Sequence, residues 1–368
     1  MSANKFPCKS CGAELAYEPG TVTLVCGYCN AVNDISLVAE PLVEIDYHST
    51  LAQLEEGGEH VEVIESRCQS CHAEVQLYAR SSSQNCPFCG SGLIAHNISK
   101  RLIKVKGVAP FAVPQRRARE QFRVWLSSRW FAPTALKRMA SVESDATYKS
   151  ASGITGLYLP FWTYDCAAAT TYVGQRGDHY YVTVPRTQTV NGRTQTVMVQ
   201  ERHTRWSGAA GGVHNAFDDV LVPASNSIPA AQLNALGTWE LKAVAAYQDD
   251  FLSGFRAESY TVGLPDGFNV ARTMMDPVIQ GTIRQDIGGD EQRITSMHPT
   301  YSNITFKHIL LPIWVSAYRY NGKVFRFLVN GQSGEIFGER PYSAWKIAAV
   351  VTACLVVITI IVAVSSSR

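Results

Sequence analysis

The chain has 368 residues, of which 46% are hydrophobic and 17% are charged. This composition excludes an intrinsically disordered chain and a polytopic membrane protein, and the length allows two or three domains with ordinary cores. The net charge of +2 hides an uneven distribution. Residues 34–66 carry nine acidic side chains and no Lys or Arg, whereas residues 100–138 carry eleven Lys or Arg and the single acid Glu120. The two stretches suggest internal pairing, or two faces for different partners.

Eight of the ten cysteines form four C-x-x-C pairs, arranged as two quartets. The surroundings repeat as well: CKSCGAEL matches CQSCHAEV, and CGYCNA matches CPFCGS, with a period of sixty residues. Each pair of C-x-x-C turns can close a tetrahedral shell of four thiolates around one Zn²⁺ ion. The sequence therefore predicts two structural zinc sites, with the ligands Cys8, Cys11, Cys26 and Cys29 in the first and Cys68, Cys71, Cys86 and Cys89 in the second.

Other chemistry for these cysteines is less consistent with the pattern. Disulfides suit an exported chain, and no signal peptide opens this one. Iron–sulfur clusters usually show other cysteine spacings, although rubredoxin-like iron shares the ligand geometry and stays open.

We expect Gly12, Gly27 and Gly90 to lie where the turns need positive φ. The remaining Cys166 and Cys354 are expected to be small packing residues.

The first part of the body contains a helical pattern and a hairpin pattern. Residues 114–131 have apolar side chains at helical spacing, including Trp125 and Trp130, opposite a row of arginines. We expect this helix to pack on a sheet, although a basic helix with tryptophans could also lie on an anionic membrane surface. Alternating residues on both sides of Asn191-Gly192 predict a long hairpin. The Gly-rich stretch 206–225 is expected to be a mobile connection.

The second part of the body echoes the first. ITGLYLPFW, ending at Trp162, resembles ITFKHILLPIW, ending at Trp314. A helix is expected to begin at Asp276-Pro277 and to end near Gly288-Gly289, and a three-stranded meander to follow around Asn321-Gly322. The body is therefore expected to be an α+β arrangement of two related helix-plus-antiparallel-sheet units.

The C-terminus contains a long apolar run. Residues 347–364 include no charge, and a helix of this length would be about 27 Å long, close to the thickness of a bilayer hydrocarbon core. Tyr342, Trp345 and Lys346 precede it, as in an interfacial belt. We expect a tail anchor. Arg340 and Lys346 outnumber Arg368 across the span, which favours a cytoplasmic body.

Sequence motifs for catalysis are missing. The chain has no G-x-x-x-x-G-K-[ST], H-E-x-x-H or G-x-S-x-G, and no G-x-G-x-x-G between a strand and a helix. We therefore expect no enzyme, no catalytic residues and no small-molecule substrate.

The whole chain resembles an uncharacterised bacterial family described as TFIIB-type zinc-ribbon membrane proteins. The resemblance rests on the eight ribbon cysteines, on the phrases LPFWTYD, GQRGD, FDDVLVPAS, TFKHILLPIW and VNGQSGEIFGERPYSAWK, and on the final span. Some members carry a label from the primosomal helicase N′, whose motor this chain lacks. One departure is His72, where the first ribbon has Gly12. The family implies action with SPFH-type (flotillin-like) scaffold proteins and phage-shock proteins in envelope-stress responses.

The expected organisation is multidomain. It comprises zinc ribbon 1 (1–36), an acidic linker (37–66), zinc ribbon 2 (67–99), α+β unit 1 (100–225), α+β unit 2 (226–340) and a transmembrane helix (346–364). The expected function is that of an adaptor at the inner membrane, with the N-terminus and body in the cytoplasm. A membrane-tethered nucleic-acid-binding protein is the alternative. Charge disfavours it, because residues 1–33 sum to zero and residues 67–99 to about +1, while phosphate binding needs several cations on one face.

Overall fold

The computed structural model describes most of the chain, with gaps around the second cysteine quartet and before the first long strand. The described residues are 6–36, 42–55, 61–69, 74–76, 83–86, 88, 91–94, 98–130, 154–190, 193–320, 323–340 and 342–366. Cys71, His72, Cys89 and Gly90, and both Asn-Gly turns, lie outside them.

The first cysteine quartet stands on a small antiparallel sheet. Its strands are β1 (Leu15–Tyr17), β2 (Thr23–Cys26) and β3 (Val32–Asp34), in that order, so β3 is an edge strand. The segment after it contains β4 (Ile45–Asp46), which pairs with the body, and α1 (Tyr47–Glu55). Asp46 accepts a hydrogen bond from the Ser49 amide at the start of α1 (2.7 Å).

Short strands surround the second quartet. They are β5 (Val61–Arg67), β6 (Glu74–Gln76), β7 (Ser83–Asn85), β8 (Gly92–Ile94) and β9 (Ile98–Leu102). β7 and β8 form a hairpin, and β5 lies between β6 and β9. The register places Glu62 opposite Arg101. Parts of the acidic and basic stretches of the sequence therefore lie in neighbouring strands of one sheet.

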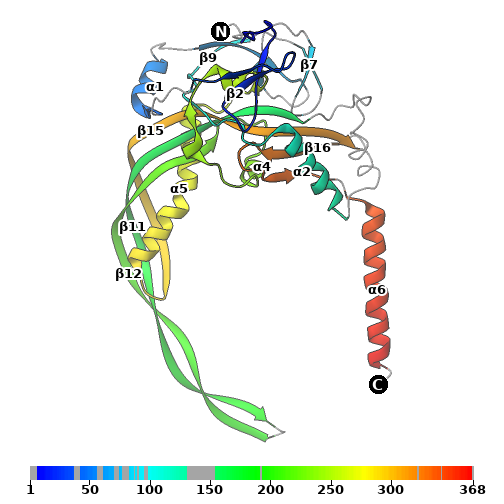
Figure 1. The fold of residues 1–368 in the computed structure, drawn as a ribbon. Coiled ribbons are helices and arrows are strands. Elements are labelled where there is room, and N and C mark those ends of the chain that lie inside the picture. The colour runs from blue at the N-terminus through cyan, green and yellow to red at the C-terminus, as the bar shows by residue number, and fades with distance from the viewer. Residues whose placement is uncertain are drawn as a thin grey trace.

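The body is an α+β structure built on one large, mainly antiparallel sheet of nine strands (Figure 1). Its long central strands are β11 (Thr155–Val190) and β15 (Glu291–Tyr320). The other strands are β10 (Gly107–Val108), β12 (Arg193–Pro223), β13 (Ala245–Ala246), β14 (Arg256–Ala257), β16 (Lys323–Asn330), β17 (Ile336–Gly338) and β4. The expected meander is confirmed, because β16 pairs with both β15 and β17.

The two L-P-x-W segments lie opposite each other at the centre of this sheet. Leu159 of β11 is the register partner of Leu311 of β15, and β11 and β15 are antiparallel. Tyr158 pairs with Pro312, and Pro160 pairs with Leu310. Since the motifs are offset by a constant number of residues, the pairing has a local two-fold axis at the Leu159–Leu311 pair.

β11 and β12 continue beyond the rest of the sheet as a twisted two-stranded arm (Figure 1). Pairing with β15 ends at Gly177, whereas pairing between β11 and β12 runs on to Val190 and Arg193. At about 3.4 Å per residue, the free part of each strand is about 40 Å long. The hairpin predicted at Asn191-Gly192 is confirmed in its strands and is much longer than expected.

The expected mobile connection at 206–225 is wrong, because β12 includes most of this segment. Its glycines allow close packing instead of mobility. A Cβ added to Gly211 would lie 2.9 Å from the hydroxyl of Tyr172 and 3.0 Å from a carboxylate oxygen of Asp286. Asp286 belongs to α5 (Leu264–Ile287), which crosses this face of the sheet (Figure 1).

Helix α5 starts twelve residues earlier than the sequence predicts and ends where predicted, at Gly288. Pro277 lies inside the helix on its exposed side and does not start it. The start is fixed by tertiary contacts: the Tyr164 hydroxyl donates to the Leu264 carbonyl (2.7 Å), and the Trp162 indole donates to the Val262 carbonyl (3.0 Å). The buried face follows every third or fourth residue: Leu264, Gly267, Phe268, Ala271, Met275, Ile279, Ile283 and Ile287.

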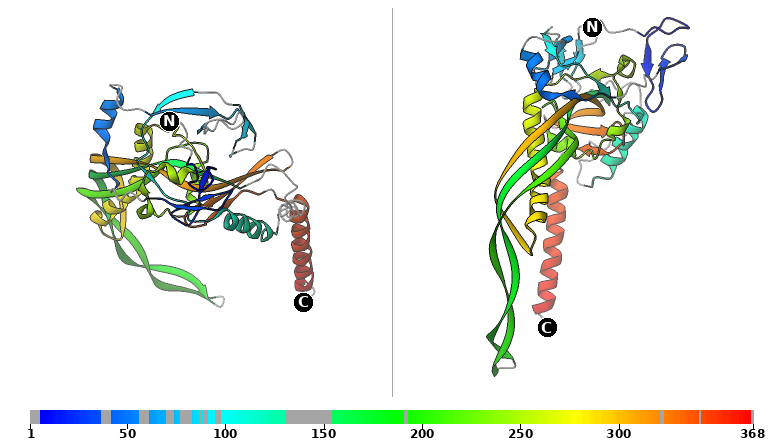
Figure 2. Two further views of the ribbon diagram at one scale, coloured as in Figure 1. Left: turned by 45° about the horizontal axis from the view of Figure 1, so that its top comes forward. Right: turned by 90° about the vertical axis from the view of Figure 1, so that its left-hand side faces the viewer.

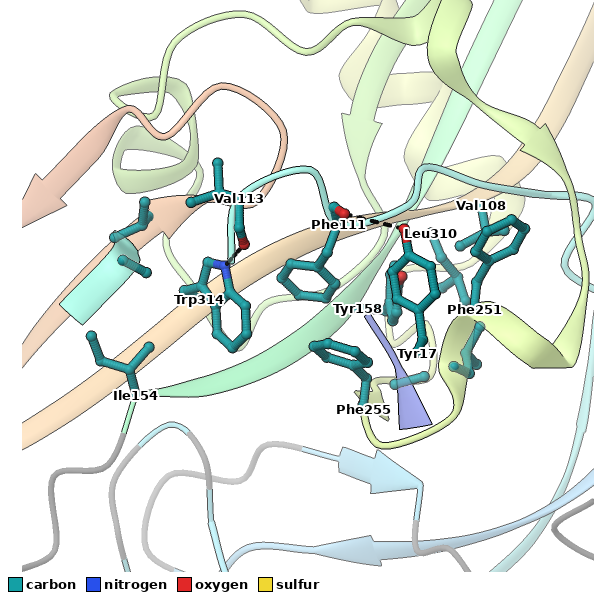
Figure 3. Close-up of a cluster of buried hydrophobic side chains, with 14 of the residues drawn as sticks. Tyr17, Val108, Phe111, Val113, Ile154, Tyr158, Phe251, Phe255, Leu310 and Trp314 are labelled. Atoms are coloured by element: carbon teal, nitrogen blue, oxygen red, sulfur yellow. Dashed lines mark hydrogen bonds between the residues drawn. The ribbon is translucent and has the colours of Figure 1, made fainter. Parts of the chain in front are cut away.

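Helix α2 (Gln115–Ser127) confirms the predicted amphipathic helix and packs its apolar side on the sheet. Phe122 and Trp125 both contact Phe327 of β16, with ring centroids 4.6 Å and 5.4 Å apart. Trp130 was expected on the same apolar side, but it lies past the end of the helix and is 73% exposed. The rest of this core joins Phe111, Tyr158 and Trp314 of the body to Tyr17 of the first small sheet (Figure 3).

Short elements complete the described chain: α4 (Ala230–Asn234), the 3₁₀ helices η1 (Leu241–Ala243) and η2 (Asp249–Leu252), and the C-terminal helix α6 (Ala344–Ser366). The stretch Trp345–Ser365 of α6 has a mean hydropathy of 3.1 and none of it is buried against the protein. Figure 1 and the left view of Figure 2 show α6 standing apart from the sheet. By length and composition it is a candidate membrane span, consistent with a tail anchor.

Candidate metal centre

The structure brings the first four cysteines together at one point. Their sulfur atoms all lie within 4.8 Å of one another. The Cys8 and Cys29 sulfurs are 3.6 Å apart, and the Cys11 and Cys26 sulfurs are 3.5 Å apart. A tetrahedron with Zn–S bonds of about 2.3 Å needs sulfur–sulfur distances of roughly 3.8 Å. The quartet therefore matches a ZnS₄ site before any ion is added.

Two backbone turns aim these sulfurs. In the first, the Cys8 amide donates to the Ala13 carbonyl (2.7 Å) and the Gly12 amide donates to the Cys8 carbonyl (2.8 Å). In the second, the Cys26 amide donates to the Ala31 carbonyl (3.0 Å) and the Asn30 amide donates to the Cys26 carbonyl (3.0 Å). The two C-x-x-C turns thus share one hydrogen-bond pattern.

Positive φ occurs at the residue after the second cysteine of each turn. Gly12 has a φ of 72° and Asn30 a φ of 57°. The expectation for Gly27 is wrong, because the position that needs positive φ in the second turn belongs to Asn30. Asparagine tolerates the left-handed region better than most residues, which explains why glycine is dispensable there.

Backbone amides also stabilise the thiolates. The Ser10 amide donates to the Cys8 sulfur (3.4 Å), and the Cys29 amide donates to the Cys26 sulfur (3.5 Å). Donation from Ser10 is the main reason why the pKa of Cys8 is lowered to about 6, and donation from Cys29 lowers the pKa of Cys26. Burial and the neighbouring thiols raise the pKa of Cys11 and of Cys29, so without a metal ion two of the four sulfurs hold their protons more tightly. Since the thiolate is the form that binds metal, this arrangement favours a soft divalent ion such as zinc. Four sulfurs fill a tetrahedral shell and leave no position for a substrate, so the centre is structural in character.

One side of this four-cysteine unit packs against the body. Tyr17 is 3% exposed and packs edge-on against Phe251, with ring centroids 5.4 Å apart. Its hydroxyl donates to the carbonyls of Thr21 (2.8 Å) and Phe111 (3.2 Å), and the Ser253 hydroxyl donates to the Leu15 carbonyl (2.6 Å). Figure 3 shows Tyr17 entering the cluster formed by Phe111, Tyr158 and Phe255. Folding of the ribbon is therefore tied to folding of the body.

The second quartet is only partly within the described residues, because Cys71 and Cys89 fall outside them. Cys68 and Cys86 are buried, with exposures of 1% and 2%. The Cys86 amide donates to the Ser91 carbonyl (2.7 Å), which is the same spacing as the bonds made by Cys8 and Cys26. One of the two predicted four-cysteine groups is thus observed, and the second shows one of its turns.

The residue before the last cysteine of each quartet is placed in opposite ways. Tyr28, in C-G-Y-C, is 83% exposed. Phe88, in C-P-F-C, is fully buried in a core with Leu157 and Leu159 of β11. The Phe88 carbonyl also accepts a hydrogen bond from the Arg326 side chain (3.4 Å). The second quartet therefore docks on the body through its aromatic residue, and the first quartet leaves the equivalent residue in solvent.

Comparison with curated proteins finds a relative of similar length, the "Uncharacterized protein YdjG" of Bacillus subtilis (strain 168). It is 23% identical over 351 residues, which cover 94% of this chain and 92% of the relative. This chain is a distant, full-length homologue of YdjG. The similarity thus covers most of both chains. No family model matches the sequence, and no solved structure does.

A second polar cluster, which the sequence does not predict, lies where β11 is irregular. Lys307 is 9% exposed, and its ammonium group lies 2.8 Å from Asp219, 3.4 Å from Glu44 and 3.5 Å from Asp165. Burial raises the pKa of Asp165 despite the nearby cation. The carboxylates of Glu44, Asp165 and Asp218 could in principle approach a metal ion, but the buried ammonium already supplies the positive charge. We interpret the cluster as an ion network that fastens β4 to the sheet.

The remaining cysteines agree with a packing role or lie in α6. Cys166 is 6% exposed and its thiol lies 3.7 Å from the sulfur of Met275. Burial raises its pKa to about 11, so the thiol is not activated as a nucleophile. Cys354 lies on the exposed surface of α6, which would face lipid if α6 spans a membrane.

Proposed function

We propose that this chain is a non-enzymatic adaptor, anchored in the inner membrane by α6, that docks a cytoplasmic protein through its first zinc ribbon. The observation that carries the proposal is the difference between Tyr28 and Phe88. Tyr28 is 83% exposed, and tyrosine is among the residues most enriched in binding hot spots.

Other features of the first ribbon support a protein contact. Val22, directly before β2, and Val32, at the start of β3, are 48% and 62% exposed. β3 pairs only with β2 among the described strands, so its outer backbone groups can accept another strand. The ribbon lies at the end of the molecule opposite to the tip of α6 (Figure 1). A partner bound there would be held at a distance from the bilayer.

The anchor follows from the composition of α6. It is the one described helix long and apolar enough to cross a membrane. The arm of β11 and β12 runs in the same direction as α6 and beyond its end (Figures 1 and 2). A two-stranded ribbon leaves backbone groups unpaired along both edges and cannot lie in the hydrocarbon layer, so the proposal requires α6 to turn away from the arm where it enters a membrane. With Arg340 and Lys346 on the N-terminal side of the span, the positive-inside rule places the body in the cytoplasm.

We extend the metal assignment to a second zinc ion held by Cys68, Cys71, Cys86 and Cys89. Support comes from the buried Cys68 and Cys86 and from the turn hydrogen bond at Cys86. An SPFH-type scaffold protein is the proposed partner class, as the resemblance to the zinc-ribbon membrane family implies. The printed description of YdjG names no partner.

We further propose that the body consists of two related units. In both, a short strand and a helix precede a hairpin, and the short strands β10 and β14 each pair in parallel with the long strand of the other unit. The Trp314 indole donates to the Val113 carbonyl, just before α2, as the Trp162 indole donates to the Val262 carbonyl, just before α5. The two units together form one platform for the ribbons.

Photo-crosslinking in native membranes tests the docking proposal. A photoreactive phenylalanine analogue would replace Tyr28 in one sample and Tyr181, a 63% exposed residue of the arm, in the control. We expect position 28 to capture one cytoplasmic protein that position 181 does not. Capture of nucleic acid alone at position 28 would contradict the adaptor proposal and favour the nucleic-acid alternative. Equal capture at both positions would also contradict it.

A further inference from the structure

A cavity of about 590 Å³ opens between the end of α2, the strands β16 and β17, and the residues that lead into α6. Trp125, Phe325 and Tyr342 form its aromatic wall, and Arg129 and Arg340 its cationic part. It lies on the side of the body from which the candidate membrane span leaves.

Neither arginine of this cavity has a hydrogen-bond acceptor among the residues that the structure describes. Each is half-buried, and the Nε atoms of Arg129 and Arg340 are inaccessible to solvent without a hydrogen-bond acceptor in the described part of the chain. Neither forms an ion pair with a described residue. The Arg129 guanidinium lies 5.4 Å from the centre of the Trp125 ring, and that of Arg340 lies 5.3 Å from the centre of the Tyr342 ring. The rings hold the guanidinium planes while leaving their N–H groups available.

The acid of the cavity does not neutralise these arginines. The Glu339 carboxylate accepts hydrogen bonds from the Gln232 side chain (2.7 Å) and from the Arg326 amide (3.0 Å), so both oxygen atoms are occupied elsewhere. The cavity therefore combines two guanidinium groups with one carboxylate, and the Nε donors of both arginines have no acceptor among the described residues. The chemistry that fits them is a phosphate group, which accepts several hydrogen bonds from guanidinium groups.

The position of the cavity indicates where this phosphate comes from. Tyr342 lies three residues before Trp345, where the candidate span begins, so at most about 10 Å of chain separates them. The headgroup layer of one leaflet is roughly 5–8 Å thick. Trp345 and Trp130 are 82% and 73% exposed, as residues at the headgroup level often are, and Lys346 donates to the Trp130 carbonyl (3.1 Å).

We propose that this cavity binds the phosphate headgroup of an anionic phospholipid from the leaflet in which α6 begins. The site would fix the body against the membrane surface and make the anchor selective for anionic lipid. The proposal rests on α6 spanning the membrane, but not on the identity of the docked protein.

The test uses the full-length chain in detergent with a mixture of phosphatidylglycerol and phosphatidylcholine, and native mass spectrometry counts the retained lipids. We expect the wild-type chain to retain one phosphatidylglycerol in preference to phosphatidylcholine. Each arginine near an anionic surface contributes about 1 kcal/mol, which is a factor of about 5 in affinity. R129Q/R340Q removes two and should weaken the retention of phosphatidylglycerol roughly 25-fold. The matched control R119Q/R123Q removes the same charge from exposed positions of α2 and should retain the lipid.

Three results would overturn the proposal. The first is the absence of a preference for phosphatidylglycerol in the wild-type chain, a measurement that needs no variant to fold. The second is an equal loss in R119Q/R123Q and R129Q/R340Q, which would show that only net charge matters. The third is full displacement of the lipid by millimolar inorganic phosphate, which would assign the cavity to a free anion. Retention of zinc in each variant verifies that the fold is intact, and partner crosslinking at position 28 reports the docking proposal separately.

Discussion

Tyr28 and Phe88 occupy the same position in two cysteine quartets sixty residues apart, yet Tyr28 is 83% exposed and Phe88 is fully buried. The two copies of the duplicated sequence therefore attach to the body in different ways. The second copy uses its aromatic residue to attach to the sheet, and the first copy attaches through Tyr17 and keeps its aromatic residue in solvent. The first copy therefore leaves its aromatic residue accessible at the surface, and the second does not.

This difference predicts unequal effects on stability. We expect Phe88→Ala to lower the free energy of unfolding by about 3–5 kcal/mol, because it opens a cavity under β11. Tyr28→Ala should change it by less than about 0.5 kcal/mol, because the side chain contacts solvent. Denaturant unfolding of the two variants in detergent measures both values, and similar losses in the two variants would contradict the assignment.

The metal proposal predicts two zinc ions per chain. Cys8→Ser should lower the measured content to about one, because three thiolates bind a structural ion poorly. Cys68→Ser should have the same effect through the second site. Elemental analysis of the purified protein gives the stoichiometry. One zinc in the wild-type chain, or iron in its place, would refute the two-zinc assignment.

Two glycines of β12 allow a matched test of whether α5 packs closely against this strand. A side chain at Gly211 would collide with Tyr172 and Asp286, whose hydrogen bond measures 2.5 Å, whereas a Cβ at Gly208 meets nothing within 4 Å. We expect Gly211→Val to destabilise the protein by about 1–3 kcal/mol through overpacking. Gly208→Val should be neutral or slightly stabilising, since valine favours strands. Thermal unfolding compares them, and an equal loss would mean that α5 does not approach β12 at this point.

His308 predicts a pH dependence of stability. It is buried between Trp162 and Tyr260, its Nδ1 lies 3.0 Å from the Ile103 carbonyl, and burial lowers its pKa to about 4. In the unfolded chain the pKa is near 6.5, so below that pH the unfolded state gains a proton that the folded state lacks. The free energy of unfolding should therefore fall by roughly 3 kcal/mol between about pH 6.5 and pH 4.

The measurement for His308 is a pair of denaturant titrations across this pH range. In His308→Gln the fall attributed to this residue should be missing, while the contributions of other groups remain. An identical pH profile in the variant would show that His308 is already protonated in the folded protein.

The sequence predicted correctly those elements that depend on residues close together in the chain. The cysteine spacing identified the first quartet, alternation identified the arm, and Gly288 marked the end of α5. The helical pattern of α2 also gave its packing, because the apolar residues fall on one side.

The failures occur where distant contacts decide the structure. Pro277 is a common first residue of a helix, but the bonds from Tyr164 and Trp162 start α5 twelve residues earlier. The glycines of 206–225 predicted a loop, because the sequence does not show that Gly211 lies in a strand against Tyr172 and Asp286 of α5. The network around Lys307 joins this residue to partners 88 to 263 positions away, so no spacing rule could find it.

The most direct test of the adaptor proposal is co-purification from native membranes in mild detergent, comparing wild type with Tyr28→Ala and with Tyr181→Ala, which removes an equally large exposed tyrosine from the arm. We predict that one scaffold-type protein accompanies the wild type and Tyr181→Ala at equal yield. It should be reduced at least tenfold with Tyr28→Ala, as expected for loss of a hot-spot residue worth about 2 kcal/mol. Unchanged recovery with Tyr28→Ala, at full zinc content, would contradict docking through the first ribbon.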